Sequence, residues 1–329
     1  MVAIISSIIR HNRSSLVARA NLNPSMPFAS QSLSVTFSLG SVFTWGTSDF
    51  LGGHAVRRAN AFHFTTLAHA GGTLFMAALA LTNQSAFPPT TSTRWALAAG
   101  LCGGAALAIF YRALASGRMG LAAPVAAVVS AGIPTVFAIF TEGLPGRIQL
   151  AGFVFAGIGL WLISRPENQT RPEGLGLAVV ASIGFAGFFL CVKQAGNASA
   201  LWTAALARFA SFALTGTIVL IGRDRRKDLA PIVQAERVEA NVSRSNSVIS
   251  LDLRKAAMAI LAGCLDISGS ALFIRASQIG RLDVVVVISS LYPAVTVLLA
   301  RFILHEHFSR WRTMGMLVAL TAVPLIAGQ

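Results

Sequence analysis

The chain has 329 residues, of which 54% are hydrophobic and only 12% are charged, whereas soluble domains carry about 25% charged residues. This composition excludes an ordinary soluble protein and indicates an integral membrane protein. The formal net charge of +14 suggests nucleic acid as a partner, but the basic residues lie in loops and at span ends without interleaved aromatic residues, so we exclude it and expect contact with membrane lipid.

Residues 1–33 precede the first apolar span. They contain Arg10, Arg13 and Arg19, several serines and no acidic residue, a composition that resembles a weak transit peptide. The alternatives are a disordered extension or a misassigned start with Met26 as the initiator. The apolar run near the N-terminus is too short to cross a bilayer, and we expect a disordered extension.

Ten apolar segments follow, each close to the roughly 20 residues that cross about 30 Å of hydrocarbon as a helix. They are residues 34–55, 61–82, 95–115, 119–141, 147–165, 174–194, 199–222, 255–277, 281–303 and 308–327. Unbroken apolar runs of this length predict transmembrane helices and not a β-barrel, whose strands are alternating segments of about 10 residues. The connections are short except for residues 223–254, which are polar throughout and predict a solvated linker.

Ionisable residues inside the first two spans indicate a polar path. An ionised side chain in hydrocarbon costs roughly 2.5 kcal/mol or more on insertion scales, so it faces protein or water. Trp45 and Asp49 lie four residues apart on one helix face, and Trp45 offers a stacking surface for an organic or cationic ligand. His69 lies near the middle of the second span, where a hydrogen-bonded packing histidine is the alternative to a residue of the path.

The second half of the chain carries its own intramembrane charges. Arg208 lies near the middle of the seventh span, and Asp266 lies near the middle of the eighth, with Ser270 one turn away on the same face. Asp266 and Arg208 either form a buried ion pair that positions helices or take part in transport, and the two roles are compatible. A polar line also follows the ninth span, at Ser289, Tyr292 and Thr296.

Prolines give a second indication of a site. Pro124 and Pro134 fall inside the fourth span and Pro293 inside the ninth. Each proline frees a backbone carbonyl that needs a partner group or a watery cavity, so the sequence predicts helix breaks at these positions. Broken helices in matching positions are typical of transporter binding sites.

An internal repeat relates the two halves. Residues 108–163 align without gaps with residues 271–326, and identical pairs recur well above chance. These pairs include Phe110/Phe273, Arg112/Arg275, Ala113/Ala276, Gly117/Gly280, Arg118/Arg281, Arg147/Arg310 and Gly152/Gly315. With five spans per copy the copies enter the membrane in opposite senses, which predicts the inverted repeat of secondary transporters.

Several stretches resemble the EamA-type members of the drug/metabolite transporter superfamily. They are WGTSDFLGG, YRALASGRMGLAAPVAAV, FTEG and VVVVISSLYPAVTVLLARFILHEHFSRWRTMGMLV, which contains Tyr292, Pro293, Glu306 and Gly315. The resemblance implies a ten-helix bundle of two EamA repeats, 34–165 and 174–327, around a central cavity. It also implies transport of small metabolites or toxic organic compounds, commonly outward.

Enzymatic motifs are not found. The HEH at residues 305–307 lacks the i, i+4 histidine spacing of a zinc helix, GLG at 175–177 lacks the rest of a dinucleotide loop, and no phosphate-binding GxxxxGK[ST] occurs. We therefore expect no catalysis, no cofactor and no metal, and a transporter driven by a gradient, with Asp49 or Asp266 exchanging a proton against a small-molecule substrate. The alternatives are a facilitative channel and a non-transporting membrane scaffold or enzyme.

The orientation predictions disagree. Basic residues are more numerous in the loops opposite the termini, so the positive-inside rule predicts external termini and a cytoplasmic 223–254 loop. The family resemblance implies cytoplasmic termini instead. We follow the charge distribution and expect a multi-pass protein of a bacterial-type plasma (inner) membrane.

Overall fold

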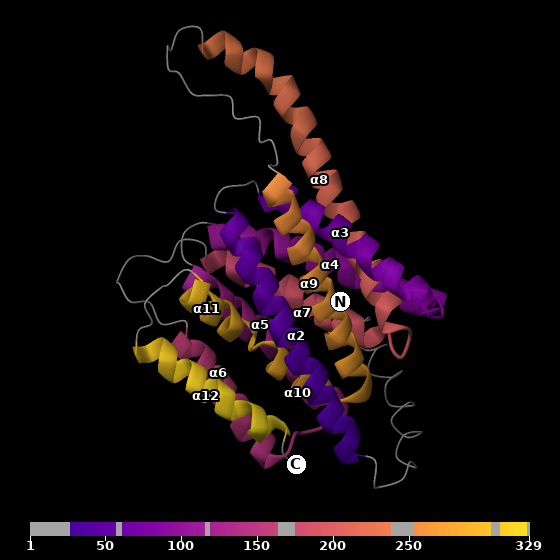
Figure 1. Cartoon of the computed structure of the whole chain (residues 1–329), viewed down its shortest axis with the longest axis vertical. Coiled ribbons are helices and arrows are strands. Elements are labelled where there is room, and N and C mark those ends of the chain that lie inside the picture. Colours follow the sequence, from indigo (N-terminus) through magenta and orange to yellow (C-terminus); the bar gives the residue numbers. More distant parts are fainter. Residues whose placement is uncertain are drawn as a thin grey trace.

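The structure, a computed structural model, describes residues 27–56, 61–115, 119–163, 175–237, 253–303 and 310–327. These residues form helices joined by short turns, and no strand occurs among them (Figure 1). The helices are α2 (Pro27–Val56), α3 (Ala61–Thr82), α4 (Thr90–Ala115), α5 (Met119–Glu142), α6 (Arg147–Ile163), α7 (Leu175–Gln194), α8 (Ala200–Arg237), α9 (Leu253–Ile279), α10 (Leu282–Ser289), α11 (Tyr292–Ile303) and α12 (Arg310–Ala327).

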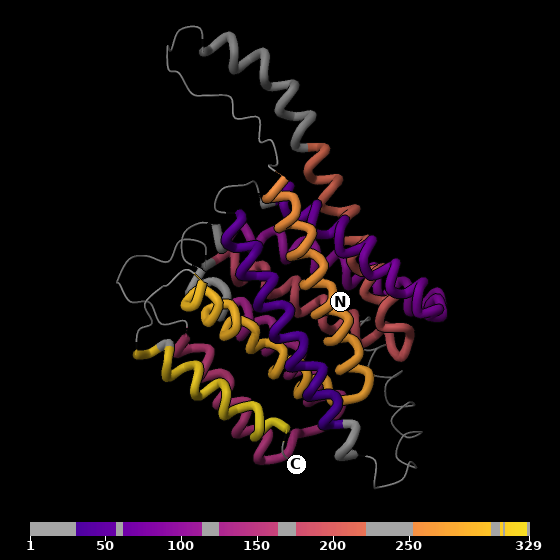
Figure 2. The backbone as a smooth tube through the Cα atoms, viewed as in Figure 1, coloured from indigo at the N-terminus to yellow at the C-terminus, as the bar shows by residue number. Residues whose placement is uncertain are grey.

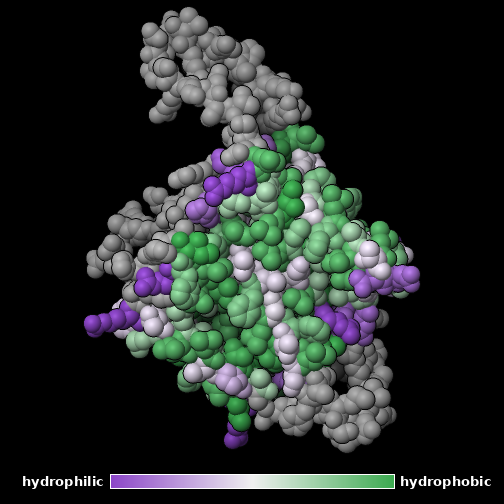
Figure 3. Space-filling view, viewed as in Figure 1, coloured by the Kyte–Doolittle hydropathy of each residue, from purple (hydrophilic) through white to green (hydrophobic). Residues whose placement is uncertain are grey.

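Most of the helices can cross a membrane. Among the described residues, 7 segments are long and apolar enough: Phe62–Thr82, Thr90–Ala113, Val125–Glu142, Gly176–Gln194, Ala200–Ile221, Leu253–Ile279 and Leu282–Ile303, the last of which includes α10 and α11. Helix α6 and residues Thr313–Ala327 of α12 are apolar but shorter. The view in Figure 3 shows a largely hydrophobic flank, with hydrophilic residues toward its edges. The protein is therefore an all-helical, multi-pass membrane protein, as predicted.

Helices α2 and α8 extend furthest beyond their predicted bounds. Helix α2 begins at Pro27, ahead of residue 34, with the proline at its first position, where the missing N–H costs nothing. Helix α8 continues to Arg237 and so includes part of the segment predicted as a linker, because the arginines and lysine after residue 222 are good helix formers. The disordered extension predicted for residues 1–33 is therefore wrong for residues 27–33, which are helical. Residues 1–26 lie outside the described residues.

The helices pack in pairs that join the two halves of the sequence (Figure 2). Helix α2 packs on α9, α4 on α7 and α8, α3 on α8 and α9, and α6 on α12. Glycines bring the backbones together: a Cβ on Gly100 would overlap the carbonyl oxygen of Ala207, and one on Gly263 would overlap that of Ala68. Close approach at small residues is the usual means of helix association in membranes.

The ninth predicted span is broken. Helix α10, whose eight residues are all buried, ends at Ser289, and α11 begins at Tyr292. The turn between them is closed by hydrogen bonds from the N–H of Ser290 to the carbonyl of Val286 (2.9 Å) and from that of Leu291 to Ile288 (3.0 Å). Pro293 then falls in the first turn of α11, where no intrahelical N–H is required.

The predicted break in the fourth span is wrong. Helix α5 is continuous from Met119 to Glu142 through both Pro124 and Pro134. A proline removes one hydrogen bond and bends a helix, but the turns on either side can continue when neighbouring helices hold them. Pro134 is buried in such packing, so matching prolines do not produce matching breaks.

Candidate functional site

A cavity lies in the middle of the bundle, between helices of both halves. It offers about 70 Å³ to the centres of water-sized molecules, within about 670 Å³ of empty space that includes its opening. The residues that line it come from α2, α4, α5, α7, α8, α9 and the start of α11: Trp45, Asp49, Gly103, Leu107, Ser130, Phe185, Phe188, Phe189, Ala204, Ala207, Arg208, Ser211, Asp266, Ser270 and Tyr292. Its position and composition are those of a small-molecule site.

A buried polar cluster forms one wall. The guanidinium of Arg208 forms an ion pair with Asp266, and the same Nη2 donates to Oγ of Ser270 at 3.2 Å. The Nη1 atom lies 3.0 Å from Nδ1 of His69. Arginine has only donors, so Nδ1 of His69 accepts and the imidazole is neutral, with its proton on Nε2. The ion pair that the sequence left as one alternative is therefore present, and it links α8 to α9.

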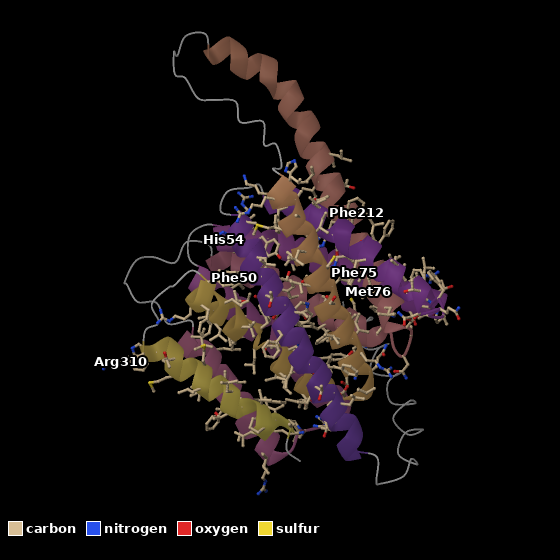
Figure 4. The ribbon with its side chains drawn as sticks, viewed as in Figure 1. Phe50, His54, Phe75, Met76, Phe212 and Arg310 are labelled. Atoms are coloured by element: carbon tan, nitrogen blue, oxygen red, sulfur yellow. The ribbon has the colours of Figure 1, made fainter. Side chains whose placement is uncertain are left out.

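Asp49 lines the cavity without such a partner. Asp49 is only 7% exposed, and no basic side chain of the described residues lies within ion-pair distance of its carboxylate. Phe50 and His54, which stack at 6.4 Å between ring centroids, follow it toward the end of α2 (Figure 4). The cavity thus contains one compensated carboxylate, Asp266, and one uncompensated carboxylate.

Trp45 is held in a fixed position. Its indole N–H donates to the carbonyl oxygen of Asp266 at 3.0 Å. A Cβ on Gly269 would stand 2.6 Å from the indole Cδ1, so the ring lies directly on α9 because residue 269 has no side chain. The rings of Phe189 (6.1 Å) and Tyr292 (6.3 Å, edge-on) pack beside it. These rings form an aromatic wall next to Asp49.

Six of the nine residues predicted for the path line the cavity: Trp45, Asp49, Arg208, Asp266, Ser270 and Tyr292. The other three lie behind it. His69 supports Arg208, Ser289 accepts a hydrogen bond from Ser41 (2.9 Å), and Thr296 donates to the carbonyl of Gly46 (3.0 Å). Ser289 and Thr296 therefore fasten α10 and α11 to α2. A role in transport for any of these residues stays a prediction.

The sequence did not indicate the rest of the lining. Phe185, Phe188 and Phe189 on α7 lie in an apolar run, where a cavity-facing phenylalanine has the same pattern as one that faces lipid. The repeat offered a signal for α4. Continued a few residues ahead of 108 at the same offset, the alignment places Gly103 opposite Asp266 and Leu107 opposite Ser270, and all four line the cavity.

A second polar cluster lies at one end of the bundle; we call Glu142, Lys193, Arg281 and Asp283 the end latch. Glu142 pairs with Lys193 at 2.8 Å and accepts a hydrogen bond from the N–H of Leu282 at 3.0 Å. Arg281 pairs with buried Asp283 at 2.8 Å and donates to the two backbone carbonyls at the end of α5. Hydrogen bonding to Asp283 raises the pKa of Arg281, which stays charged. The end latch ties α5 of the first half to α7 and α10 of the second, whereas Glu306 lies outside the described residues.

Comparisons with known proteins agree with this architecture. The model of the EamA-like transporter family matches residues 32–165 and 172–328. Among 28 matching chains of solved structures, one titled "Crystal structure of protein" has a TM-score of 0.62 and 15% identity, over 89% of this chain and 96% of that chain. That likeness shows a shared fold. None of the curated proteins matches the chain in sequence.

Proposed function

The chain belongs to the EamA-like transporter family, and on this premise we propose that it is a secondary transporter that moves a small metabolite or toxic organic compound by alternating access, as an exporter of the plasma membrane. The observation that carries the proposal is the cavity at mid-bundle. It is lined by both halves of the chain, and the intramembrane charges Asp49, Arg208 and Asp266 face it. Charged residues inside membrane spans are functional sites by default.

The recurring contacts support two inverted five-helix repeats. The packing of α2 on α9 recurs as that of α7 on α4, which is the same pairing with the halves exchanged. The glycines recur too: a Cβ on Gly152 would meet Ile326 at 2.6 Å, and one on Gly315 would meet Ile163 at 2.7 Å. Counting α10 and α11 as one broken span, with α2, α6 and α12 included, gives ten spans. Halves that pack reciprocally can rock against each other around a shared cavity.

The end latch supports alternation between two states. It joins helices of both halves, and fully buried α10 lies directly beside it. We infer that the cavity is closed toward this end and that the contacts of Glu142 with Lys193 and Leu282 break when that end opens. A packed interface between helices has two stable arrangements and does not deform continuously. A small shift of the helices can therefore switch this end of the bundle from closed to open.

Asp49 is the better candidate of the two predicted proton carriers. The charge of Asp266 is balanced by Arg208, whereas the carboxylate of Asp49 has no such partner among the described residues. A buried carboxylate without a counter-ion favours its protonated form. Proton release to one side and uptake from the other would then drive the substrate.

The test has two stages. Cells that overexpress the protein are first screened for altered growth on amino acids, organic cations and dyes, and the active solute is then measured in proteoliposomes. We expect saturable flux that is accelerated by the same solute on the other side and that loses its pH dependence in Asp49→Asn. Flux without saturation or counter-acceleration would indicate a channel, and a folded Asp49→Asn variant with full pH-dependent flux would refute the proton role.

A further inference from the structure

The charges of the cavity restrict what it can bind. Its charged lining residues are Asp49, Arg208 and Asp266, two carboxylates and one guanidinium, so its formal charge is −1 when Asp49 is ionised. The one basic group is already engaged: Nη2 of Arg208 by Asp266 and Ser270, and Nη1 by His69. Among the residues that the structure describes, an anionic cargo therefore finds no free cation in the cavity.

The hydroxyl groups of the lining serines are engaged as well. Ser211 donates to the carbonyl of Gly100 at 2.7 Å, Ser130 to that of Ala127 at 3.2 Å, and Ser270 to that of Asp266 at 3.1 Å. A cargo with many hydroxyl groups would lose its hydration without gaining these donors. The remaining lining is aromatic or aliphatic, which suits an apolar body.

The uncompensated carboxylate and Trp45, the residue that α2 contributes to the aromatic wall, share one face of that helix. Asp49 lies one turn from Trp45, whose ring is fixed by its hydrogen bond to α9. A cation gains from a carboxylate within ion-pair distance and from the faces of aromatic rings within about 6 Å. An onium group beside Asp49, with its body along Phe185 and Leu107, would satisfy both requirements.

We propose that the cargo is a singly charged organic cation with an aromatic or aliphatic body, bound at Asp49 in place of a proton; this rests on the proposed transport function. One carboxylate holds either the proton or the cation. Each loaded cavity is then neutral, so one cation exchanges for one proton with no net movement of charge. A dication would leave an unbalanced positive charge in a site of low dielectric, and such cargo is rejected.

The other titratable and charged groups around Asp49 do not compete for this role. They are Asp266 on α9, Tyr292 at the start of α11, Tyr111 on α4, and, behind Asp266, Arg208 on α8 and His69 on α3. Asp266 and Arg208 neutralise each other, and the Nδ1 atom of His69 is engaged by Arg208. Tyrosines ordinarily titrate near pH 10. The proton that exchanges with the cation is therefore the one on Asp49.

The test uses the purified full-length chain and three probes that share a phenylethyl body: the quaternary phenylethyl-trimethylammonium ion, 3-phenylpropionate and phenylethanol. We expect saturable binding of the ammonium probe alone, weakening about tenfold per pH unit below the pKa of Asp49, with one proton released per probe bound. Asp49→Asn should weaken binding at least tenfold and abolish its pH dependence. Asp49→Glu should keep both properties.

Two further variants sharpen the result. Trp45→Leu should weaken ammonium binding several-fold while leaving its pH dependence intact, whereas Thr47→Val, on α2 outside the cavity lining, should change neither. In proteoliposomes, exchange of the ammonium ion for protons should be insensitive to an imposed potassium diffusion potential. Binding of phenylpropionate in place of the ammonium ion, ammonium binding unaffected by Asp49→Asn, or exchange that follows the potential would each overturn the proposal.

Failure of this inference and failure of the proposed function give different results. If another solute shows saturable counterflow while the ammonium probe does not bind, the transporter stands and the cargo class is wrong. If neither the ammonium probe nor any solute from the growth screen shows counterflow, both proposals fail.

Discussion

Asp49 and Asp266 are both carboxylates of the same cavity, but their surroundings differ. Asp266 is paired with Arg208, which is itself 8% exposed. Removing one member of a buried ion pair leaves the other charge without compensation, and this costs about 3–5 kcal/mol. Removing a buried charge that has no partner carries no such free-energy cost, because no other charge is left unpaired. The two aspartates should therefore respond in opposite ways to the same substitution.

We predict that Asp266→Asn lowers the free energy of unfolding in detergent by about 3–5 kcal/mol, whereas Asp49→Asn leaves it unchanged or raises it. Denaturant unfolding of both variants beside the wild type measures the difference. A double variant, Arg208→Met with Asp266→Leu, should recover most of the loss because no charge is left unpaired. Equal destabilisation by the two single substitutions would show that Asp49 also has a buried counter-ion.

The second prediction concerns Gly269. A Cβ there would stand 2.6 Å from the indole of Trp45, so Gly269→Ala must displace the ring or separate α2 from α9. We expect a shifted tryptophan emission and a loss of stability of about 1–3 kcal/mol, as for other overpacked interiors. Gly132→Ala is the matched control, because nothing lies within 4 Å of its added Cβ. Similar spectra and stabilities for the two variants would contradict the placement of the indole.

For single residues, the sequence predicts which charged side chains line the cavity better than which apolar ones do. Asp49, Arg208 and Asp266 were identifiable because a charged side chain inside an apolar span is costly in lipid and must face protein or water. Phe188 and Phe189 were not, because the same residue suits lipid, helix packing and a cavity wall. The partner of His69 was also hidden, since only the fold brings residues 69 and 208 together.

Among the elements, α5 and the α10–α11 pair show what proline alone can predict. Both segments contain prolines, but only the second is broken, at Ser290 and Leu291. The break coincides with hydroxyl contacts to α2, from Ser41 to Ser289 and from Thr296 to Gly46. The helix bounds themselves were largely predictable from apolar runs, and the main errors lie at α2 and α8, where helix-compatible residues continue beyond the membrane-length segment.

The end latch makes α10 the element whose opening can be tested. Glu142 and Lys193 are partly exposed, with side chains 13% and 23% accessible, so we assign their ion pair about 1 kcal/mol after allowing for solvent screening. We predict that Glu142→Gln speeds amide hydrogen exchange in residues 282–289 about fivefold, since those amides exchange when this end opens. Mass spectrometry of the corresponding peptides measures the rate.

The control for this experiment is Arg275→Gln. Arg275 is exposed at the same end of the bundle, and the hydrogen bond that its Nη1 donates to Gln278, at 3.3 Å, stays within α9. Its replacement should leave exchange in α10 unchanged. If Glu142→Gln leaves the exchange of α10 at the wild-type rate, the ion pair does not hold this end closed.

At the scale of the whole molecule, the internal repeat predicted more of the architecture than any single span. It placed Gly152 opposite Gly315, and each of these glycines makes the same close approach in the α6–α12 pair. The pairing of α2 with α9 and of α4 with α7 could not be predicted from the sequence. Small residues that allow close packing occur throughout the spans and do not indicate which helix packs against which.

The orientation of the molecule decides which side of the membrane the end latch faces. Helices that alternate in direction place the end latch on the same side as the C-terminus. Basic residues are more numerous on the other side, so the positive-inside rule predicts that the C-terminus and the end latch face outward. We therefore expect a phosphatase fused after Gln329 to be active and a fluorescent protein fused there to be dark. The structure would then be closed to the outside, and cargo would enter from the cytoplasm, the direction that an exporter requires. A fluorescent fusion with an inactive phosphatase would reverse this assignment and place the closed end in the cytoplasm.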